Sequence, residues 1–443
     1  MKTLIALALL AATAGAASST FATTQSTAAT QQKSYPVAAA NALLDDLDAG
    51  HFDAVYARFA PAMAQAVSAD KLKVVWAALP QQFGKFEHRG PARVQVANGM
   101  TIVDVPLAFE HFALEASIAT DADGKIAGFL VRPAPPPPAA TRSDLLAREV
   151  RFGPAHRGEL PGTLLLPKGH GPFAAVVLVH GSGASDRNET LGGTRVFLDI
   201  AEGLADSGIA SLRYEKRSKA RPQDFDGAFT IDDETTDDAV AAVAYLRTQP
   251  DIDPKRVYLI GHSQGAMMAP RIAQHAPSLA GIVLMAAPAR HLEDILYDQF
   301  TYLAKADGQV DVQEAAQLAQ IKDAAAKVKT FGDEMPAATK LLLELPASYW
   351  RDLRNYDPVA VAKTERAPLL ILQGDRDFQV TAPDWTRWQT AFGNDRRATI
   401  HHYPALNHLF VAGSGPGTMA EYATPGHVDT RAIADIAAWI KAH

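Results

Sequence analysis

The spacing of hydrophobic side chains changes within the first third of the chain. Apolar residues first recur at helical spacing, and Ser68, a typical N-cap residue, precedes one of these stretches. After Gly90 the apolar positions alternate, which indicates strands. The expected helices are 37–47, 52–59 and 69–79, and the expected strands are 94–96, 102–107, 114–118 and 126–131. Helices followed by an antiparallel sheet predict a small α+β domain over residues 35–132.

A proline-rich run follows this domain. Residues 133–141 contain Pro133 and then four consecutive prolines from Pro135 to Pro138. Such a run favours extended polyproline and acts as a semi-rigid spacer between domains. We therefore expect a linker over 133–141 and a second domain over 142–443.

In the second domain short apolar runs alternate with helical patterns. A hairpin over 147–167 is expected to lead into the alternating part. The expected strands are 173–179, 210–214, 257–260, 282–285, 369–372 and 399–403, and the expected helices are 196–207, 237–247, 264–275 and 430–441. This alternation predicts an α/β fold with a doubly wound, mostly parallel sheet.

One stretch interrupts the alternation. Residues 291–357 have a helical pattern with breaks at Gly308 and Pro336, and they lie between two expected strands of the sheet. An insertion at the carboxyl ends of parallel strands lies where such folds place their sites. We expect a helical cap that limits the length of the bound substrate and excludes water; the alternative is a purely stabilising helical pair.

Composition and charge exclude several classes of protein. The chain has 443 residues, of which 48% are hydrophobic and 21% charged, so neither a wholly disordered chain nor a collagen-like one fits. The formal net charge of −7 disfavours nucleic-acid binding, which needs a basic surface. The absence of cysteine excludes disulfides, thiolate metal sites and a cysteine nucleophile.

The first residues have the pattern of a secretory signal peptide. Lys2 precedes an apolar run of about 14 residues, too short for the roughly 20 that span a bilayer. Small residues at Ala14-Gly15-Ala16 offer a cleavage site, and Thr20-Phe21-Ala22 offers a second. We expect residues 1–22 to be removed, no stable membrane insertion afterwards, and a periplasmic or secreted protein.

The strongest chemical signal is a serine between two glycines. Gly261-His-Ser263-Gln-Gly265 follows an expected strand and precedes an expected helix. A serine on so tight a turn projects its hydroxyl above the sheet, and the glycines let strand and helix approach each other. Ser263 is therefore the expected nucleophile; the alternative is a serine in an ordinary turn.

A second glycine-rich loop follows the strand that ends at Val179. It reads His180-Gly-Ser182-Gly183, and such a loop can direct a backbone N–H at a developing oxyanion. We assign the two oxyanion donors to the N–H groups of Ser182 and Gln264. A phosphate-binding loop is the alternative, but a third glycine and a following Lys-Ser/Thr are missing.

The acid and the base are expected after later strands. Asp375 and Asp377 both follow Gly374, and the residue three past the glycine, Asp377, is the expected acid, with Asp375 second. His408 lies in the loop after the last strand and is the expected base. His401 and His402 lie within that strand and are expected to be structural.

Residues from about 145 to 443 resemble a bacterial α/β-hydrolase of the esterase and acyl-peptidase-like branch. The resemblance rests on short segments: 162–167, 177–183, 186–189, 213–217, 260–265 and 374–380. Family members often read D-K-R-G where this chain has Glu215-Lys216-Arg217-Ser218, so the following loop is expected to differ. Residues 35–132 resemble a small domain of unknown function that precedes such hydrolases in exported bacterial proteins, with a cone-like α+β fold.

This resemblance implies a serine hydrolase that cleaves small-molecule carboxylic esters through an acyl-enzyme. Ser263 would attack, His408 would carry the proton and Asp377 would orient it, with no metal or organic cofactor. A serine peptidase or amidase of the same fold, a thioesterase, and a non-catalytic ligand-binding protein are the alternatives. The aromatic residues of the N-terminal domain have two interpretations: they line a ligand pocket, or they simply fill a core. These residues are Trp76, Phe83, Phe86, Phe109 and Phe112.

Overall fold

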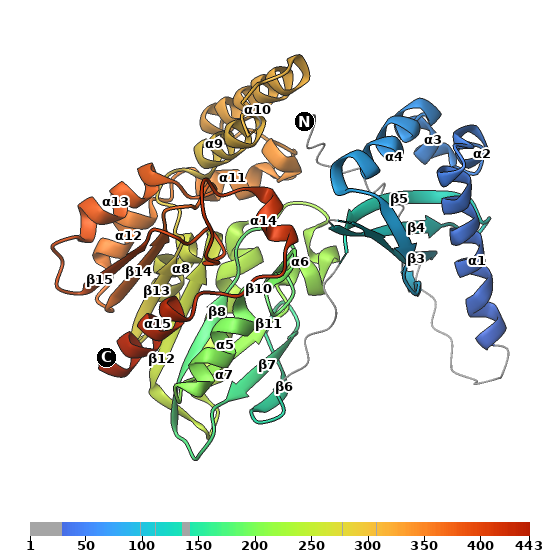
Figure 1. Ribbon diagram of the computed structural model, residues 1–443. Coiled ribbons are helices and arrows are strands. Elements are labelled where there is room, and N and C mark those ends of the chain that lie inside the picture. The colour runs from blue at the N-terminus through green and yellow to red at the C-terminus, as the bar shows by residue number, and fades with distance from the viewer. Residues whose placement is uncertain (1–28, 98, 111, 135–141, 277, 307) are drawn as a thin grey trace. The chain divides into compact units, whose positions relative to one another are not determined.

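The computed structural model describes residues 29–443 except 98, 111, 135–141, 277 and 307 (Figure 1). It divides into two compact units, residues 1–137 and 138–443. The expected signal peptide and most of the expected linker lie outside the described residues. No helix in the described part of the chain is both long and apolar enough to span a bilayer.

The N-terminal unit has helices first and an antiparallel sheet afterwards. Its helices are α1 (Ala29–Asp48), α2 (Phe52–Tyr56), α3 (Pro61–Ala66) and α4 (Ala69–Phe83). Its strands are β1 (Phe86–Arg89), β2 (Arg93–Ala97), β3 (Met100–Phe109), β4 (Phe112–Thr120) and β5 (Ile126–Pro133). The sheet has the order β1-β3-β4-β5, and β2 also pairs with β3. Ser68 caps α4 as expected, since its hydroxyl accepts the Lys71 N–H.

The second unit contains an eight-stranded sheet in the order β15-β14-β13-β12-β8-β11-β7-β6. These strands are β6 (Leu146–Phe152), β7 (Leu160–Leu166), β8 (Phe173–Val179), β11 (Ala210–Tyr214), β12 (Ile252–His262), β13 (Gly281–Met285), β14 (Leu369–Gly374) and β15 (Ala398–Tyr403). The six from β11 to β15 along this order pair in parallel, and β6 and β7 pair antiparallel. The doubly wound, mostly parallel sheet expected from the alternating pattern is therefore present.

Helices cover both faces of this sheet (Figure 1). On one face α5 (Val196–Asp206) and α15 (Thr430–Ala442) pack through side chains such as Phe197 and Ile436. On the other face lie α7 (Asp237–Arg247), α8 (Gln264–His275), α12 (Pro358–Thr364) and α13 (Ala382–Phe392), which contribute Met268 and Trp388 to the core. The short elements are β9 (Thr190–Leu191), β10 (Thr194–Arg195), α6 (Arg217–Ala220), η1 (Pro222–Phe225), η2 (Asp232–Thr236) and α14 (Met419–Ala423).

The insertion between β13 and β14 is helical over part of its length. It forms α9 (Leu292–Ala304), α10 (Val312–Thr330), the short η3 (Leu342–Glu344) and α11 (Ala347–Leu353), which gather beyond one end of the sheet (Figure 1). The helical pattern expected around Leu341 to Leu345 is wrong: residues 331–346 form turns and one short 3₁₀ segment. Leu343 and Glu344 have positive φ angles, a conformation that ends a helix.

Candidate active site

Ser263 occupies the turn from β12 into α8. Its φ of 53° and ψ of −120° lie outside the regions that serine adopts freely. The Ser263 N–H donates to the Met285 carbonyl at 2.9 Å, and the Ser263 carbonyl accepts the Met267 N–H at 2.9 Å. A Cβ on Gly261 would collide with the Gly265 carbonyl, and a Cβ on Gly265 with the Val179 carbonyl. The two glycines therefore permit the tight turn that holds a partly exposed Ser263.

Asp377 and His408 lie together, although 31 positions separate them in the sequence. Asp377 follows β14 and His408 follows the neighbouring strand β15, so parallel pairing brings the two loops to one edge of the sheet. His408 Nδ1 is 2.8 Å from Asp377 Oδ2, and both side chains are buried. The other carboxylate oxygen, Oδ1, accepts the N–H groups of Gln379 and Val380 at 2.8 and 2.9 Å.

The other aspartate and histidines considered, Asp375, His401 and His402, have different partners. Asp375 forms an ion pair with His402, and both side chains are partly exposed. His402 also stacks on Trp385, with ring centroids 5.2 Å apart. His401 Nδ1 lies 3.5 Å from an oxygen of Asp435. Of the two aspartates considered, Asp377 is thus the one that the structure brings to His408.

His262 connects the serine turn to the histidine loop. Its Nε2 donates to the His408 carbonyl at 2.9 Å, and the two imidazole rings lie 4.8 Å apart. Because His262 directly precedes Ser263, this bond holds the backbone of the expected base beside the backbone of the expected nucleophile. The loop after His408 turns sharply, since Asn407 Oδ1 accepts the N–H groups of Leu409 and Val411.

The loop after β8 approaches Ser263 at Gly181. A Cβ built on Gly181 would lie 3.2 Å from Ser263 Cβ, a closer approach than most side chains make, so this glycine lies directly beside the serine. The Gly181 N–H donates to Glu189 Oε1 at 2.6 Å. Ser182, which follows Gly181, is exposed, and Gln264, which follows Ser263, is 4% exposed. Both residues assigned as oxyanion donors are therefore adjacent to residues that meet at the serine turn.

Glu189 and His262 form a buried charged pair behind this turn. Glu189 Oε2 lies 2.9 Å from His262 Nδ1, without the alignment of a hydrogen bond, and each side chain is 1% exposed. Burial alone would lower the pKa of His262, but the neighbouring Glu189 carboxylate outweighs burial and raises it. The pKa of Glu189 is lowered by His262 in turn, against the effect of its own burial. Each group therefore favours the ionised form of the other.

Sequence reasoning assigned no role to Glu189 or to Lys216. Both lie in segments that carry the family resemblance, 186–189 and 213–217, and both are buried. Their burial becomes visible only in the structure, where Glu189 accepts the Gly181 N–H and Lys216 donates to the Gly181 carbonyl.

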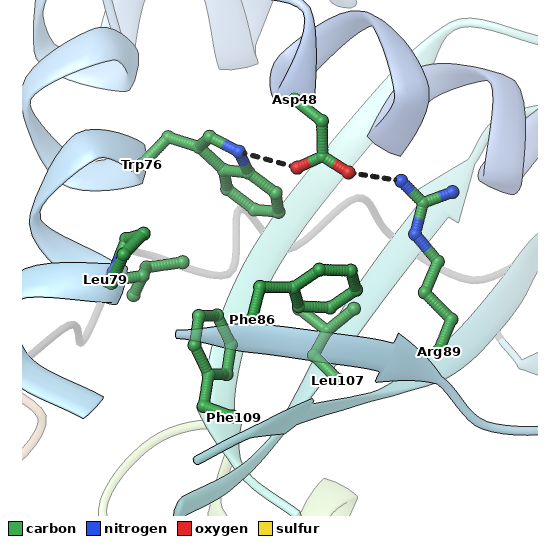
Figure 2. Close-up of a pocket in the computed structure, with 8 residues that line it drawn as sticks. Asp48, Trp76, Leu79, Phe86, Arg89, Leu107 and Phe109 are labelled. Atoms are coloured by element: carbon green, nitrogen blue, oxygen red, sulfur yellow. Dashed lines mark hydrogen bonds and ion pairs between the residues drawn. The ribbon is translucent and has the colours of Figure 1, made fainter. Parts of the chain in front are cut away.

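The N-terminal unit contains a small hollow lined by aromatic side chains (Figure 2). Figure 2 shows Asp48 accepting the Trp76 indole N–H, 3.1 Å away, and facing the Arg89 guanidinium. The hollow measures about 30 Å³. Phe109 is buried, and the other aromatics of this unit pack against the same core. Of the five aromatics considered, Trp76, Phe86 and Phe109 line the hollow, and all five belong to the core of this unit or pack against it.

Metal ligands are not gathered at the site. Within the described part of the chain, no group of three or more histidine, aspartate or glutamate side chains could hold a metal ion.

Comparison with known proteins places the chain in a family. Residues 176–421, more than half of the chain, match the alpha/beta hydrolase family, and residues 40–129 match a family described as a protein of unknown function, DUF3887. The chain belongs to the alpha/beta hydrolase family. It is 35% identical over 374 residues to esterase EstD of Thermotoga maritima, covering 84% of this chain and 88% of that protein. This relationship supports a carboxylic ester hydrolase as the class of enzyme.

Solved structures with a similar fold are more distant in sequence. Est1E from Butyrivibrio proteoclasticus with bound ferulic acid is 16% identical, with a TM-score of 0.43, and covers 66% of this chain and 100% of that one. The Pyrococcus furiosus esterase Pf2001 is 14% identical, with a TM-score of 0.41, and covers 62% of this chain and 90% of that one.

Proposed function

We propose that the protein is a serine carboxylic ester hydrolase with a triad of Ser263, His408 and Asp377. The observation that carries this proposal is the buried 2.8 Å contact between His408 Nδ1 and Asp377, beside a serine in a strained turn. Backbone strain of this kind costs on the order of 1–3 kcal/mol and persists where the surroundings enforce it. The order Ser, Asp, His along the chain is that of α/β-hydrolases.

In the first half of the reaction Ser263 Oγ attacks the acyl carbon of the ester. His408 takes the serine proton on Nε2 and then gives it to the leaving alkoxide, so that an alcohol departs and an acyl-serine remains. Asp377 accepts the Nδ1–H of His408, which fixes the tautomer and stabilises the imidazolium formed in the transition state. Because Asp377 is itself held by two backbone N–H groups, the imidazole has one preferred orientation.

In the second half a water molecule replaces the alcohol. His408 removes a proton from the water, which attacks the acyl carbon and releases the carboxylic acid and free Ser263. In both halves a negative charge develops on the former carbonyl oxygen. We assign its stabilisation to the backbone N–H groups of Ser182 and Gln264, which follow Gly181 and Ser263.

We propose small-molecule acyl esters as substrates, with cleavage of amides as the competing activity. The test is a series of p-nitrophenyl esters of increasing acyl length, assayed beside the matching p-nitroanilides. Ester turnover well above anilide turnover supports an esterase, whereas anilide cleavage at a comparable kcat/KM would identify a peptidase or amidase.

Substitution of the nucleophile tests the triad. Ser263→Ala is expected to lower ester turnover by about 10⁴-fold or more, because loss of a triad nucleophile removes the acyl-enzyme route. Ser207→Ala, at the end of α5, is the matched control and is expected to keep wild-type turnover. Ser263→Ala turnover within tenfold of the wild type would refute the assignment.

We also propose that the protein is exported. The support is the pattern of residues 1–22, a single positive charge before a short apolar run and small residues at a cleavage site. The test is the N-terminal sequence of the protein recovered from the periplasm or medium. A start after Ala16 or Ala22 supports export, and a cytoplasmic protein that begins at residue 1 or 2 contradicts it.

A further inference from the structure

Lys216 holds the carbonyl group of Gly181. Its Nζ donates to the Gly181 oxygen at 2.8 Å, and the lysine is 2% exposed. The peptide bond between Gly181 and Ser182 is trans, so its C=O and N–H point in opposite directions. A lysine that fixes the Gly181 carbonyl on one side therefore fixes the direction of the Ser182 N–H on the other side.

Glu189 holds the opposite end of the same glycine. Its Oε1 accepts the Gly181 N–H at 2.6 Å, while its Oε2 faces His262. Gly181 is thus bound at its N–H by a buried carboxylate and at its C=O by a buried ammonium group. Hydrogen bonds with one charged partner are roughly twice as strong as neutral ones, so the loop beside Ser263 is held firmly.

Lys216 also reaches the second residue assigned as an oxyanion donor. Its Nζ lies 3.3 Å from the side-chain oxygen Oε1 of Gln264. The amide nitrogen of that side chain, Nε2, donates to the Tyr349 hydroxyl at 2.7 Å. One lysine therefore contacts both Gln264 and the peptide group that carries the Ser182 N–H.

These contacts close into a ring of four side chains. The Tyr349 hydroxyl donates to Glu234 Oε2 at 3.4 Å, and Glu234 Oε1 lies 3.2 Å from Lys216 Nζ. We call Lys216, Gln264, Tyr349 and Glu234 the polar ring. Its members come from the segment after β11, the start of α8, helix α11 of the insertion, and η2.

The polar ring is shielded from water. Tyr349 is 1% exposed and Gln264 4%, and the Glu234 side chain is 11% exposed. Burial raises the pKa of Tyr349 well above its ordinary value, so the phenol stays neutral and can accept from Gln264 while donating to Glu234. Each partner in a buried network fixes the others, because a broken link leaves an unpaired polar group without water.

We propose that Lys216 is a positioning residue for the oxyanion hole and that the polar ring couples this hole to helix α11 of the insertion. The proposal rests on the proposed function, since it assigns a role within that triad's active site. Lys216 need not touch the substrate. It aims the Ser182 N–H through the Gly181 carbonyl and steadies Gln264 through its side chain, before any substrate binds. Preorganised donors of this kind act in the transition state rather than in substrate binding.

The test compares Lys216→Met with Lys219→Met. Methionine preserves the length of the side chain and removes its charge, and Lys219 is an exposed lysine on the adjoining helix α6. For Lys216→Met we expect kcat for a p-nitrophenyl ester to fall about 100-fold with KM within about threefold, the effect of losing one oxyanion donor. Lys219→Met is expected to keep wild-type values.

Binding of a transition-state analogue separates positioning from folding. A trifluoromethyl ketone adds reversibly to Ser263 Oγ: the C–O bond forms, the ketone oxygen becomes the oxyanion, and the serine proton passes to His408. Its inhibition constant is expected to rise in Lys216→Met by the same factor as kcat/KM falls. If thermal stability falls while kcat and this inhibition constant stay within threefold of the wild type, Lys216 is structural and the proposal is wrong.

Tyr349→Phe tests the coupling to α11 and serves also if Lys216→Met does not fold. It removes one hydroxyl and leaves Lys216 on Gly181. We expect kcat to fall about five- to tenfold at unchanged KM, and an unchanged kcat would overturn the coupling. Labelling of Ser263 by a fluorophosphonate in the wild type is a separate arm: failure there refutes the triad itself, whereas success with unaffected variants refutes the polar ring alone.

Discussion

Both carboxylate oxygens of Asp377 accept hydrogen bonds, so its side chain is fixed in one orientation. Oδ1 accepts two backbone N–H groups, and Oδ2 accepts from Gln373 Nε2 at 3.2 Å as well as facing His408. A carboxylate fixed on both oxygens cannot rotate to follow the imidazole, so the imidazole adopts the orientation set by the carboxylate. Asp375, two residues earlier, pairs with His402 at the partly exposed end of the strand.

The two aspartates should therefore differ sharply in their effect on catalysis. Asp377→Asn is expected to lower kcat by about 10³- to 10⁴-fold, because an amide in this position favours the wrong tautomer of His408. Asp375→Asn is the matched control and is expected to stay within about threefold of the wild type. Steady-state ester assays decide the matter, and a larger loss in Asp375→Asn would mean that the acid is misassigned.

His180 is a buried histidine that stays neutral. Its Nε2 lies 3.0 Å from the Asp186 carbonyl, and its ring packs against Phe197 and Tyr214. Burial lowers the pKa of His180 to about 4. In the unfolded chain a histidine takes up its proton near pH 6.5, so between pH 6.5 and 4 the unfolded state binds more protons. The free energy of unfolding therefore falls as the pH falls through this window.

Removing this histidine should flatten the acid side of the stability profile. His180→Gln keeps a side-chain N–H for the Asp186 carbonyl and cannot titrate. The loss of unfolding free energy between pH 7 and pH 4.5 is expected to be about 2 kcal/mol smaller than in the wild type. Urea denaturation at both pH values measures it, with the exposed His170→Gln as control. An identical loss in His180→Gln and the wild type would contradict a neutral buried His180.

At the level of single residues, the sequence predicted what local motifs encode. Gly261, Ser263 and Gly265 define the serine turn because each has a local steric reason to be there. The polar ring gave no such signal. Lys216 and Tyr349 come from distant segments, and an isolated lysine or tyrosine in a sequence has the same pattern whether it is buried against a partner or exposed.

At the level of helices and strands, the bounds of α7 and α8 are those that the pattern predicts. Helix α8 follows β12 directly, whereas α7 continues from η2. Strand β1 was missed because Phe86–Arg89 has a single apolar residue, and α3 because it is too short to show a period. Residues 341–345 mimic a helical stripe, but Pro336 and Pro346 flank them and positive φ angles interrupt them.

The insertion offers a prediction about acyl-chain length. Helix α10 buries few side chains, Ala325 and Val328 among them, whereas α9 places Tyr302 against Phe378 beside the acid loop. Replacing residues 309–330 by a short Gly/Ser linker leaves α9 and α11 in place. If the insertion limits the acyl pocket, the variant should hydrolyse longer p-nitrophenyl esters relative to the acetate than the wild type does. A folded variant with an unchanged chain-length profile would leave α10 as scaffold.

At the level of the whole molecule, the chain consists of two units with separate cores. The core of the N-terminal unit includes Leu44 and Val105, and the core of the second unit surrounds its eight-stranded sheet. The composition change at the proline run predicts a boundary there, and the chain is divided into its two compact units, residues 1–137 and 138–443, within the same stretch of sequence. What the N-terminal unit does for the enzyme has no local sequence signal.

Cleavage in the proline run should give a folded hydrolase. Residues 142–443 expressed alone are expected to be soluble, to unfold cooperatively, and to retain ester turnover, since a polyproline spacer carries few contacts between domains. Circular dichroism, a thermal scan and the p-nitrophenyl ester assay check this, with the full chain as control. Aggregation of 142–443 would show that the N-terminal unit covers an apolar surface of the hydrolase.

The most direct test of the proposed chemistry is capture of the acyl-enzyme. The protein is mixed with p-nitrophenyl acetate, quenched in acid within the first turnover and digested for mass spectrometry. We predict a burst of p-nitrophenol and one acetyl group on the peptide that contains Ser263, with neither in Ser263→Ala. Turnover of the ester by the wild type with an acetyl group on another residue, or equal labelling of Ser263→Ala, would contradict Ser263 as the nucleophile.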